Sequence, residues 1–220
     1  MILNSIGGKL LGLFLGILIS MPAFTQSGNP PIPVEWMING RQANFQLVLK
    51  RSFTPTSKFD LLSIAVFTEN LNEDKLGENA VIPVQINYNL GKKGFAISAG
   101  SEYNGMVGLT PLIGAQHVFA NRKILALTVF SWFLNSSQDA KILGLYEFKP
   151  MISEKWALYT RLQFMYNRGF SEGVHNRSFL NLRAGLKKGP LGFGLGYNID
   201  RYGPISLERA NLGVFTRWEF

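Results

Sequence analysis

The chain has 220 residues, of which 46% are hydrophobic and 16% are charged, with a formal net charge of +8. Soluble domains are typically about 25% charged, so this composition favours lipid over water as the surroundings. The cations are dispersed and no RNA-binding or zinc-finger motif accompanies them, which argues against nucleic acid as a partner. The absence of cysteine excludes both a disulfide-stapled domain and a lipoprotein.

Residues 1–25 have the organisation of a cleaved signal peptide. A single lysine precedes the apolar run 10–21, which is too short to span a bilayer comfortably. Ala23 and Thr25 supply small residues at the minus-three and minus-one positions, so we predict cleavage before Gln26. A retained membrane anchor is the alternative.

The rest of the chain is predicted to be a short lead followed by one folded domain. Residues 26–33, with Asn29-Pro30-Pro31, have the composition of a flexible or plugging segment. Residues 34–220 contain no run of roughly twenty apolar residues, which a transmembrane helix requires. Only a closed β-barrel would then satisfy the backbone hydrogen bonds of this chain in lipid.

Twelve segments of this domain have the length of tilted membrane strands. The alternation of apolar and polar residues is clearest after Pro190, where Leu191, Phe193 and Leu195 alternate with glycines. Some other segments, such as 58–68, are apolar on both faces, which indicates packing inside a narrow lumen or against a partner. If the first short strand does not form, ten strands is the alternative, because single-chain bacterial barrels have even numbers. The predicted strands are 34–39, 43–53, 58–68, 82–90, 94–103, 109–119, 123–134, 141–149, 158–167, 180–187, 191–200 and 209–220.

The last twelve residues carry the most specific signal. Ala210, Leu212, Val214, Thr216, Trp218 and Phe220 lie on one face of an extended strand, polar residues and Gly213 lie on the other, and only Phe215 breaks the pattern. This segment resembles the closing strand of Gram-negative outer-membrane β-barrels. The resemblance implies an all-β, antiparallel, up-and-down transmembrane barrel surrounded by outer-membrane lipids. It also places Trp218 and Phe220 in the aromatic girdle and makes the terminal Phe220 the signal that the outer-membrane assembly machinery reads.

If Phe220 lies at the periplasmic rim, every turn can be assigned to the periplasmic or the outer side. The basic and acidic residues of the turns then separate between the two rims. This orientation predicts short periplasmic turns and longer outer loops. The predicted basic periplasmic rim consists of Lys58, Lys92, Lys93, Arg122, Lys123, Lys155, Lys187 and Lys188. The predicted acidic outer rim consists of Glu69, Glu73, Asp74, Glu78, Asp139 and Glu172. We hypothesise that the basic rim lies against anionic phospholipid headgroups; the alternative is that these cations only keep the turns soluble.

The same register turns a polar set of side chains toward the barrel interior. Barrels of about twelve strands lie between small filled barrels and open channels, so this set either plugs the interior or lines a water path. The inward glycines at 192, 194 and 196 favour open space, and a slight cationic excess favours small anionic solutes. The predicted lumen residues are Lys50, Gln85, Asn87, Glu102, Arg161, Gln163, Arg183, Asn211 and Arg217, together with Gln46, Glu147 and Glu219.

Catalytic and metal chemistry are poorly supported. His117 near Ser98, and His175 near Ser171 and Glu172, have the residue types of a hydrolase, but a rim or solvated loop position is the simpler interpretation. The acidic loop 69–79 has carboxylates for a divalent cation but lacks EF-hand spacing. We therefore expect no catalytic residue, no metal and no cofactor.

The sequence thus predicts a non-enzymatic outer-membrane barrel that acts as a narrow passive pore or as a membrane-embedded structural component. The first alternative is a barrel subunit of an envelope secretion or assembly complex, bound to another envelope protein. Gln26 after the predicted cleavage point is similar to exports of the Bacteroidota, in which small barrels serve such machines. The second alternative is a lipid-modifying hydrolase of the outer membrane, and the third is a soluble secreted β-sandwich.

Overall fold

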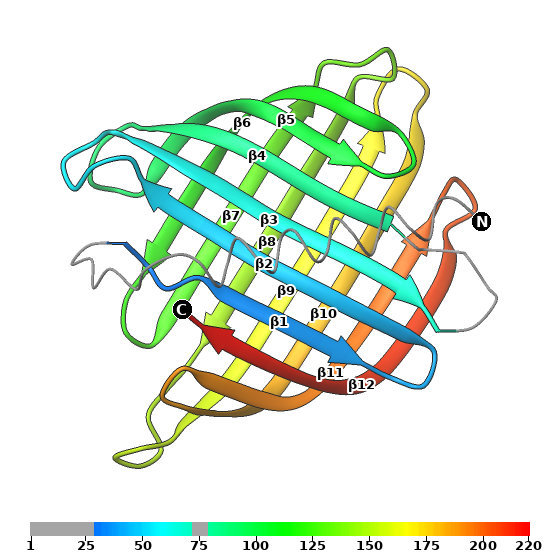
Figure 1. The fold of residues 1–220 in the computed structure, drawn as a ribbon. Coiled ribbons are helices and arrows are strands. Elements are labelled where there is room, and N and C mark those ends of the chain that lie inside the picture. The colour runs from blue at the N-terminus through cyan, green and yellow to red at the C-terminus, as the bar shows by residue number, and fades with distance from the viewer. Residues whose placement is uncertain (1–28, 72–78) are drawn as a thin grey trace, which may run out of the picture.

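The computed structural model describes residues 29–71 and 79–220, and the predicted signal peptide lies outside them. The chain forms a closed barrel of twelve antiparallel strands, in which sequence neighbours pair and β1 pairs with β12 (Figure 1). The predicted twelve-stranded up-and-down barrel is confirmed, and the ten-stranded and β-sandwich alternatives are wrong. Within the described residues, no helix is long and apolar enough to cross a membrane. The strands are β1 (Pro33–Ile38), β2 (Gln42–Ser52), β3 (Phe59–Asn70), β4 (Asn79–Asn89), β5 (Phe95–Asn104), β6 (Gly108–Ala120), β7 (Ile124–Phe133), β8 (Asp139–Phe148), β9 (Ala157–Gly169), β10 (Val174–Lys188), β11 (Leu191–Tyr202) and β12 (Leu207–Glu219).

The strands run further than predicted at the end of the barrel away from Phe220, which we call the far end. β10 begins at Val174 rather than at residue 180, and a bulge between His175 and Arg177 allows this extension. The loops at the far end are correspondingly short. Connection 149–156 at the Phe220 end is as long as connection 71–78 at the far end, so the predicted difference in loop length is wrong.

The barrel closes through its shortest strand. β1 pairs with β12 from Pro33 opposite Glu219 to Ile38 opposite Val214. Ile32 and Phe220 extend this seam by exchanging two backbone hydrogen bonds of 3.0 Å. Because β1 ends at Ile38, the first seven residues of β12 continue past it toward the far end. This difference in length leaves a notch in the wall.

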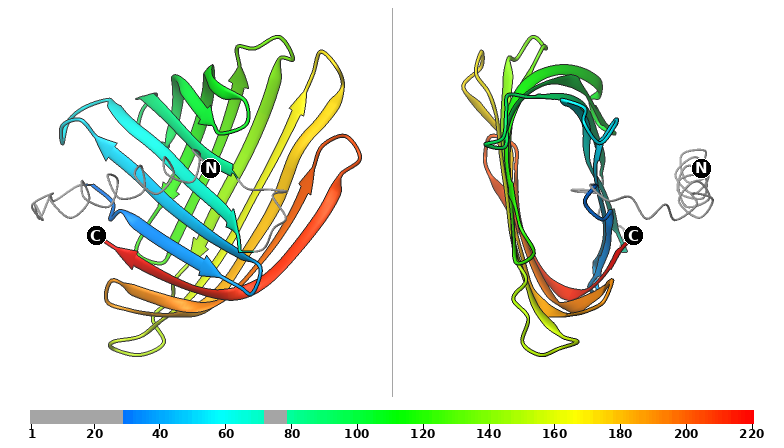
Figure 2. Two further views of the ribbon diagram at one scale, coloured as in Figure 1. Left: turned by 45° about the vertical axis from the view of Figure 1, so that its right-hand side comes forward. Right: turned by 90° about the vertical axis from the view of Figure 1, so that its left-hand side faces the viewer.

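The barrel is flattened to an oval cross-section (Figure 2). Four glycines, Gly100 on β5, Gly114 on β6, Gly185 on β10 and Gly194 on β11, lie unusually close to an adjacent strand. A Cβ atom at any of these positions would lie 2.0–2.2 Å from a carbonyl oxygen of that strand. Glycine is therefore needed for the strands to approach each other this closely.

Apolar side chains fill one half of the flattened interior. Leu62 and Ile64 of β3 pack against Leu127 and Val129 of β7 and Leu145 of β8, and all five are buried. These strands belong to opposite walls, so the cluster closes that half of the barrel. This contact explains why segment 58–68 is apolar on both faces, since its inward row packs inside a narrow lumen.

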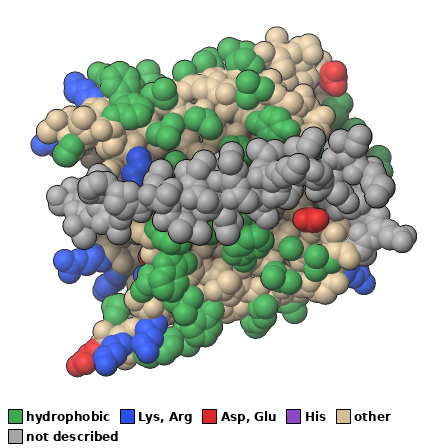
Figure 3. All heavy atoms as spheres, viewed as in Figure 1, with side chains coloured by type: hydrophobic (Ala, Val, Ile, Leu, Met, Phe, Trp, Pro, Cys, Tyr) green, Lys and Arg blue, Asp and Glu red, His purple; other side chains and the backbone are tan. Residues whose placement is uncertain are grey.

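The outer face is covered by exposed hydrophobic side chains (Figure 3). On β12, Leu212, Val214 and Trp218 are 67%, 60% and 44% exposed. Similar side chains on β4, β5 and β11 are Val84, Ile86, Ile97, Phe193 and Leu195. Soluble monomers rarely expose many large apolar side chains together, so their spread over several strands indicates contact with lipid.

Candidate functional site: the polar interior

The other half of the interior is held by ion pairs that cross the barrel. Oε1 of Glu35, on β1, accepts hydrogen bonds from Nη2 of Arg161 on β9 at 2.6 Å and from Nε of Arg183 on β10 at 2.8 Å. All three side chains are at most 3% exposed. Because β1 and β9 belong to opposite walls, these bonds tie the walls together across the lumen.

A second ionic cluster lies closer to the Phe220 end. The carboxylate of Glu147, on β8, pairs with Arg217 of β12 at 2.9 Å and with Lys149 at 2.9 Å, and it accepts a hydrogen bond from the Tyr159 hydroxyl at 3.1 Å. Arg217 also lies 3.3 Å from Glu219. A buried ion pair is stable only when most of its hydrogen-bonding groups are satisfied, as they are for the Glu147 carboxylate.

Polar residues on β2 to β8 form two smaller clusters. Asp60 accepts hydrogen bonds from Lys50 at 2.6 Å and from Asn87 at 2.7 Å, near the Phe220 end. Further along, Glu102 of β5 forms an ion pair with Lys141 of β8 across the interior. In the same region, the Gln85 amide donates to the hydroxyl of Ser131 at 3.2 Å.

The predicted lumen residues thus point into the barrel but do not form a single site. Lys50 and Asn211 lie nearer the rims and are partly exposed. Glu219 is also partly exposed. The other nine, all at most 7% exposed, are Gln46, Gln85, Asn87, Glu102, Glu147, Arg161, Gln163, Arg183 and Arg217. Sequence reasoning missed Glu35, the acceptor shared by two arginines. The alternation of β1 could have identified it, because Glu35 lies on the face opposite Val34 and Trp36.

The glycine row on β11 does not leave open space at Gly194 or Gly196, although Gly192 has room beside it. A Cβ atom at Gly196 would lie 2.8 Å from the sulfur of Met37 and 3.1 Å from Nη1 of Arg183, so these side chains already occupy that volume. Phe215, which breaks the alternation of β12, turns inward and packs against Met37 and Tyr159. Large side chains from neighbouring strands therefore fill the room that Gly196 leaves.

Several buried polar atoms of the interior have no hydrogen-bond partner among the described residues. They include both amide atoms of Gln163 and of Gln116, Nε and Nη1 of Arg161, and Oε2 of Glu35. An unsatisfied buried polar group costs about 1–3 kcal/mol, and water is the usual partner where protein groups are absent. The polar half is therefore better suited to hydration than to acting as a dry plug.

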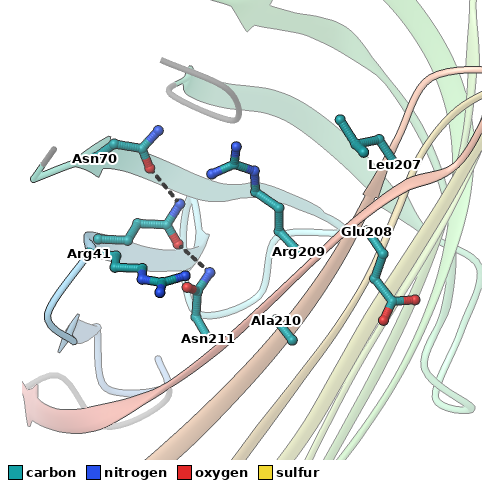
Figure 4. Close-up of a pocket in the computed structure, with 8 residues that line it drawn as sticks. Arg41, Asn70, Leu207, Glu208, Arg209, Ala210 and Asn211 are labelled. Atoms are coloured by element: carbon teal, nitrogen blue, oxygen red, sulfur yellow. Dashed lines mark hydrogen bonds between the residues drawn. The ribbon is translucent and has the colours of Figure 1, made fainter. Parts of the chain in front are cut away.

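A cavity with a volume of about 350 Å³ lies in the notch at the far end. It is placed where β12 continues past β1, beside the turn between β1 and β2 (Figure 4). Asn39 fixes this turn, since its side-chain oxygen accepts the backbone N–H groups of Arg41 at 2.7 Å and Gln42 at 2.8 Å. The lining residues are Arg41, Gln42, Asn70, Leu207, Glu208, Arg209, Ala210 and Asn211.

The two rims differ less in charge than predicted. The eight predicted basic-rim residues all lie at the Phe220 end, six in turns and Lys187 and Lys188 at the end of β10, and Lys187 pairs with Glu219 at 3.0 Å. Glu69, Asp139 and Glu172 lie at the far end, whereas Glu73, Asp74 and Glu78 lie outside the described residues. The far end also carries cations, so it is mixed rather than acidic. These cations are Arg41, Arg168, Arg177, Arg201 and Arg209.

The two hydrolase arrangements do not assemble. His117 and Ser98 lie on opposite faces of the sheet, because Ser98 is buried inside and His117 follows the outward row of β6. His175 contacts Ser178 at 3.1 Å, while the hydroxyl of Ser171 donates to a backbone carbonyl instead. Across residues 29–71 and 79–220, no group of three or more His, Asp or Glu side chains is placed to hold a metal ion.

No protein-family model matches the chain, and no curated protein matches its sequence significantly. Among solved structures, the chain is similar to the KdgM porin, with 11% identity over 86% of this chain and 98% of that one and a TM-score of 0.47. For the NanC porin the identity is 7%, the coverages are 87% and 100%, and the TM-score is 0.48. An outer-membrane channel from Pseudomonas putida F1 is 10% identical over 91% of this chain and 99% of that one, with a TM-score of 0.42. At such identities the likeness concerns the barrel fold alone.

Proposed function

We propose that this chain is an integral barrel of the bacterial outer membrane that acts as a narrow passive pore and has no enzymatic activity. The observation that carries the proposal is a series of polar levels on the inner face of β9–β12 and β1. One level consists of four carboxamides in register, Gln163, Asn181, Asn198 and Asn211. The next level toward Phe220 contains Arg161 beside Arg183. A level with Tyr159, Phe215 and Met37 follows, and beyond it Arg217 lies beside Glu35.

The pore is narrow because the apolar cluster fills half of the oval and the Glu35 ion pairs cross the other half. Water and small ions are the solutes that such a path suits. In the Glu35 and Glu147 clusters, the buried cations Arg161, Arg183 and Arg217 outnumber the two buried carboxylates by three to two, so this segment of the path favours anions.

Phe220 and Trp218 support an orientation with their end of the barrel in the periplasm. Both are exposed on the outer face, as expected for an aromatic girdle and for a terminal residue that the assembly machinery recognises. The basic rim at this end would meet the anionic headgroups of the inner leaflet. Outer-membrane lipids are then the principal partners.

A closed structural barrel is the second candidate, and the apolar cluster between opposite walls is the observation that favours it. The two candidates differ in whether the purified barrel conducts. A bound envelope protein remains an alternative that copurification from native membranes would test.

Arg183→Gln is expected to lower the chloride-to-potassium permeability ratio about twofold or more, because it removes a buried cation from the polar path. Reversal potentials across a salt gradient in planar bilayers measure this ratio. Arg168→Gln, which removes a cation from the far rim, serves as the control and should leave the ratio nearly unchanged. An unchanged ratio in Arg183→Gln would place the conduction path elsewhere.

A further inference from the structure

One inward row of the polar path is apolar across five adjacent strands. In register, this row consists of Tyr159 on β9, Gly185 on β10, Gly194 on β11, Phe215 on β12 and Met37 on β1. The inward rows on either side of it carry charged side chains. A solute that follows the proposed path must therefore cross this row, which we call the apolar level.

Two aromatic rings close the apolar level. Tyr159 and Phe215 come from strands that are separated by β10 and β11, yet their ring centroids are 5.6 Å apart. The rings can meet because Gly185 and Gly194, which lie between them in the row, have no side chains to hold them apart. Together with Met37, both residues are at most 3% exposed. Water therefore has almost no access to this level.

The two rings are held in place differently. The Tyr159 hydroxyl donates a hydrogen bond to Glu147 at 3.1 Å, and the guanidinium group of Arg217 lies 5.2 Å from the centre of the same ring. Phe215 has no polar atom in its side chain and is held by packing, with the guanidinium group of Arg183 6.0 Å from its ring centre. Phe215 is therefore the more easily displaced of the two.

Phe215 also has space to turn into. It pairs with Gly194, and Gly192 is the next residue on the same face of β11 in the direction of Phe220. A Cβ atom at Gly192 would meet nothing closer than 3.8 Å. The volume above Gly192 is therefore open, and it lies diagonally across from the Phe215 ring.

We propose that Phe215 is the movable part of an apolar gate, that Tyr159 is its fixed part, and that the gate limits the size of the solutes that pass. The inference rests on the proposed pore. Apolar constrictions in channels exclude water and ions until they widen. The closed level widens when the Phe215 ring turns toward Gly192 and leaves the ring of Tyr159. Water and small ions then pass between the charged rows on either side, whereas larger solutes are stopped.

Substitutions that shorten Phe215 test the gate by single-channel recording in planar bilayers. Phe215→Ala is expected to raise the unitary conductance about threefold, because it removes the ring from the constriction. Phe215→Leu keeps an apolar side chain in place and should raise the conductance less, and it can be measured even if the alanine variant folds poorly. Phe193→Ala removes a ring from the lipid-facing side of β11 and should conduct like the wild type.

Liposome swelling in glycerol gives a second measurement. Because glycerol is uncharged, its entry reports the size of the constriction rather than its charge. The swelling rate should rise from the wild type to Phe215→Leu to Phe215→Ala and stay unchanged in Phe193→Ala.

The results for the gate and for the pore can be told apart in barrels that migrate as folded on gels. A conducting wild type with unchanged conductance in both Phe215 variants would overturn the gate and leave the pore standing. A silent wild type with a conducting Phe215→Ala would support the gate and overturn the passive pore. Silence in all four proteins would overturn both.

Discussion

Gly194→Ala is expected to prevent stable closure of the barrel. The new Cβ atom would lie 2.2 Å from the carbonyl oxygen of Ala184 and 2.5 Å from Cα of Gly185. Both are backbone atoms, so the clash is relieved only by separating β10 from β11 at this point. We expect a loss of about 3 kcal/mol or more, at the upper end of overpacking effects. Heat-modifiable migration on gels and unfolding in guanidinium chloride measure it.

Gly192→Ala is the matched control on the same strand and the same face. Its new Cβ atom would meet nothing closer than 3.8 Å, which is an ordinary contact with Arg217. The barrel should therefore keep its stability to within about 1 kcal/mol. If both variants unfolded alike, glycine would matter on β11 for a reason other than the close approach of β10 and β11.

Glu35→Gln is expected to have the second large effect. It removes the negative charge that Arg161 and Arg183 share, and breaking a buried pair costs about 3–5 kcal/mol because its partners remain buried and charged. Since β1 pairs over only six residues, the closing seam should loosen and unitary conductance should rise severalfold. Unfolding of the solubilised barrel and bilayer recording measure the two effects.

An exposed ion pair at the far rim provides the control. Glu208→Gln breaks the pair with Arg201, in which both side chains are more than half exposed, so stability should change by less than about 1 kcal/mol. Adding Arg161→Met to Glu35→Gln should restore part of the lost stability, because it removes one of the two unpaired cations. A loss of stability in Glu208→Gln as large as that in Glu35→Gln would mean that burial does not govern these pairs.

The strands could be predicted because the alternation of residue types that reveals a strand lies within that strand's own sequence. Each side chain of β12 faces lipid or lumen according to its position in a two-residue period, so the alternation ending at Phe220 fixed the register. Strand ends were harder to place. The extension of β10 to Val174 depends on pairing with β9 and on a bulge, neither of which is visible as an alternation of residue types.

The shape of the interior depends on contacts between opposite walls. The alternation of apolar and polar residues along a single strand does not show which residues of the opposite wall it will meet. The glycines of β11 could be counted, but whether they open space depended on Met37 and Arg183 from other strands. Likewise, the notch at Arg41 exists because β1 is shorter than β12 at the closing seam. Glu35 could have been recognised from its own strand, but its two arginine partners could not.

Single-channel recording of the wild-type barrel in planar bilayers tests the proposed pore most directly. Protein that migrates as a folded, heat-modifiable barrel should give small, uniform current steps with chloride more permeable than potassium. The steps should be well below those of open barrels of sixteen or more strands, because the apolar cluster and the Glu35 ion pairs obstruct the lumen. A folded barrel without current steps, or one that prefers potassium, would contradict a narrow anion-favouring pore.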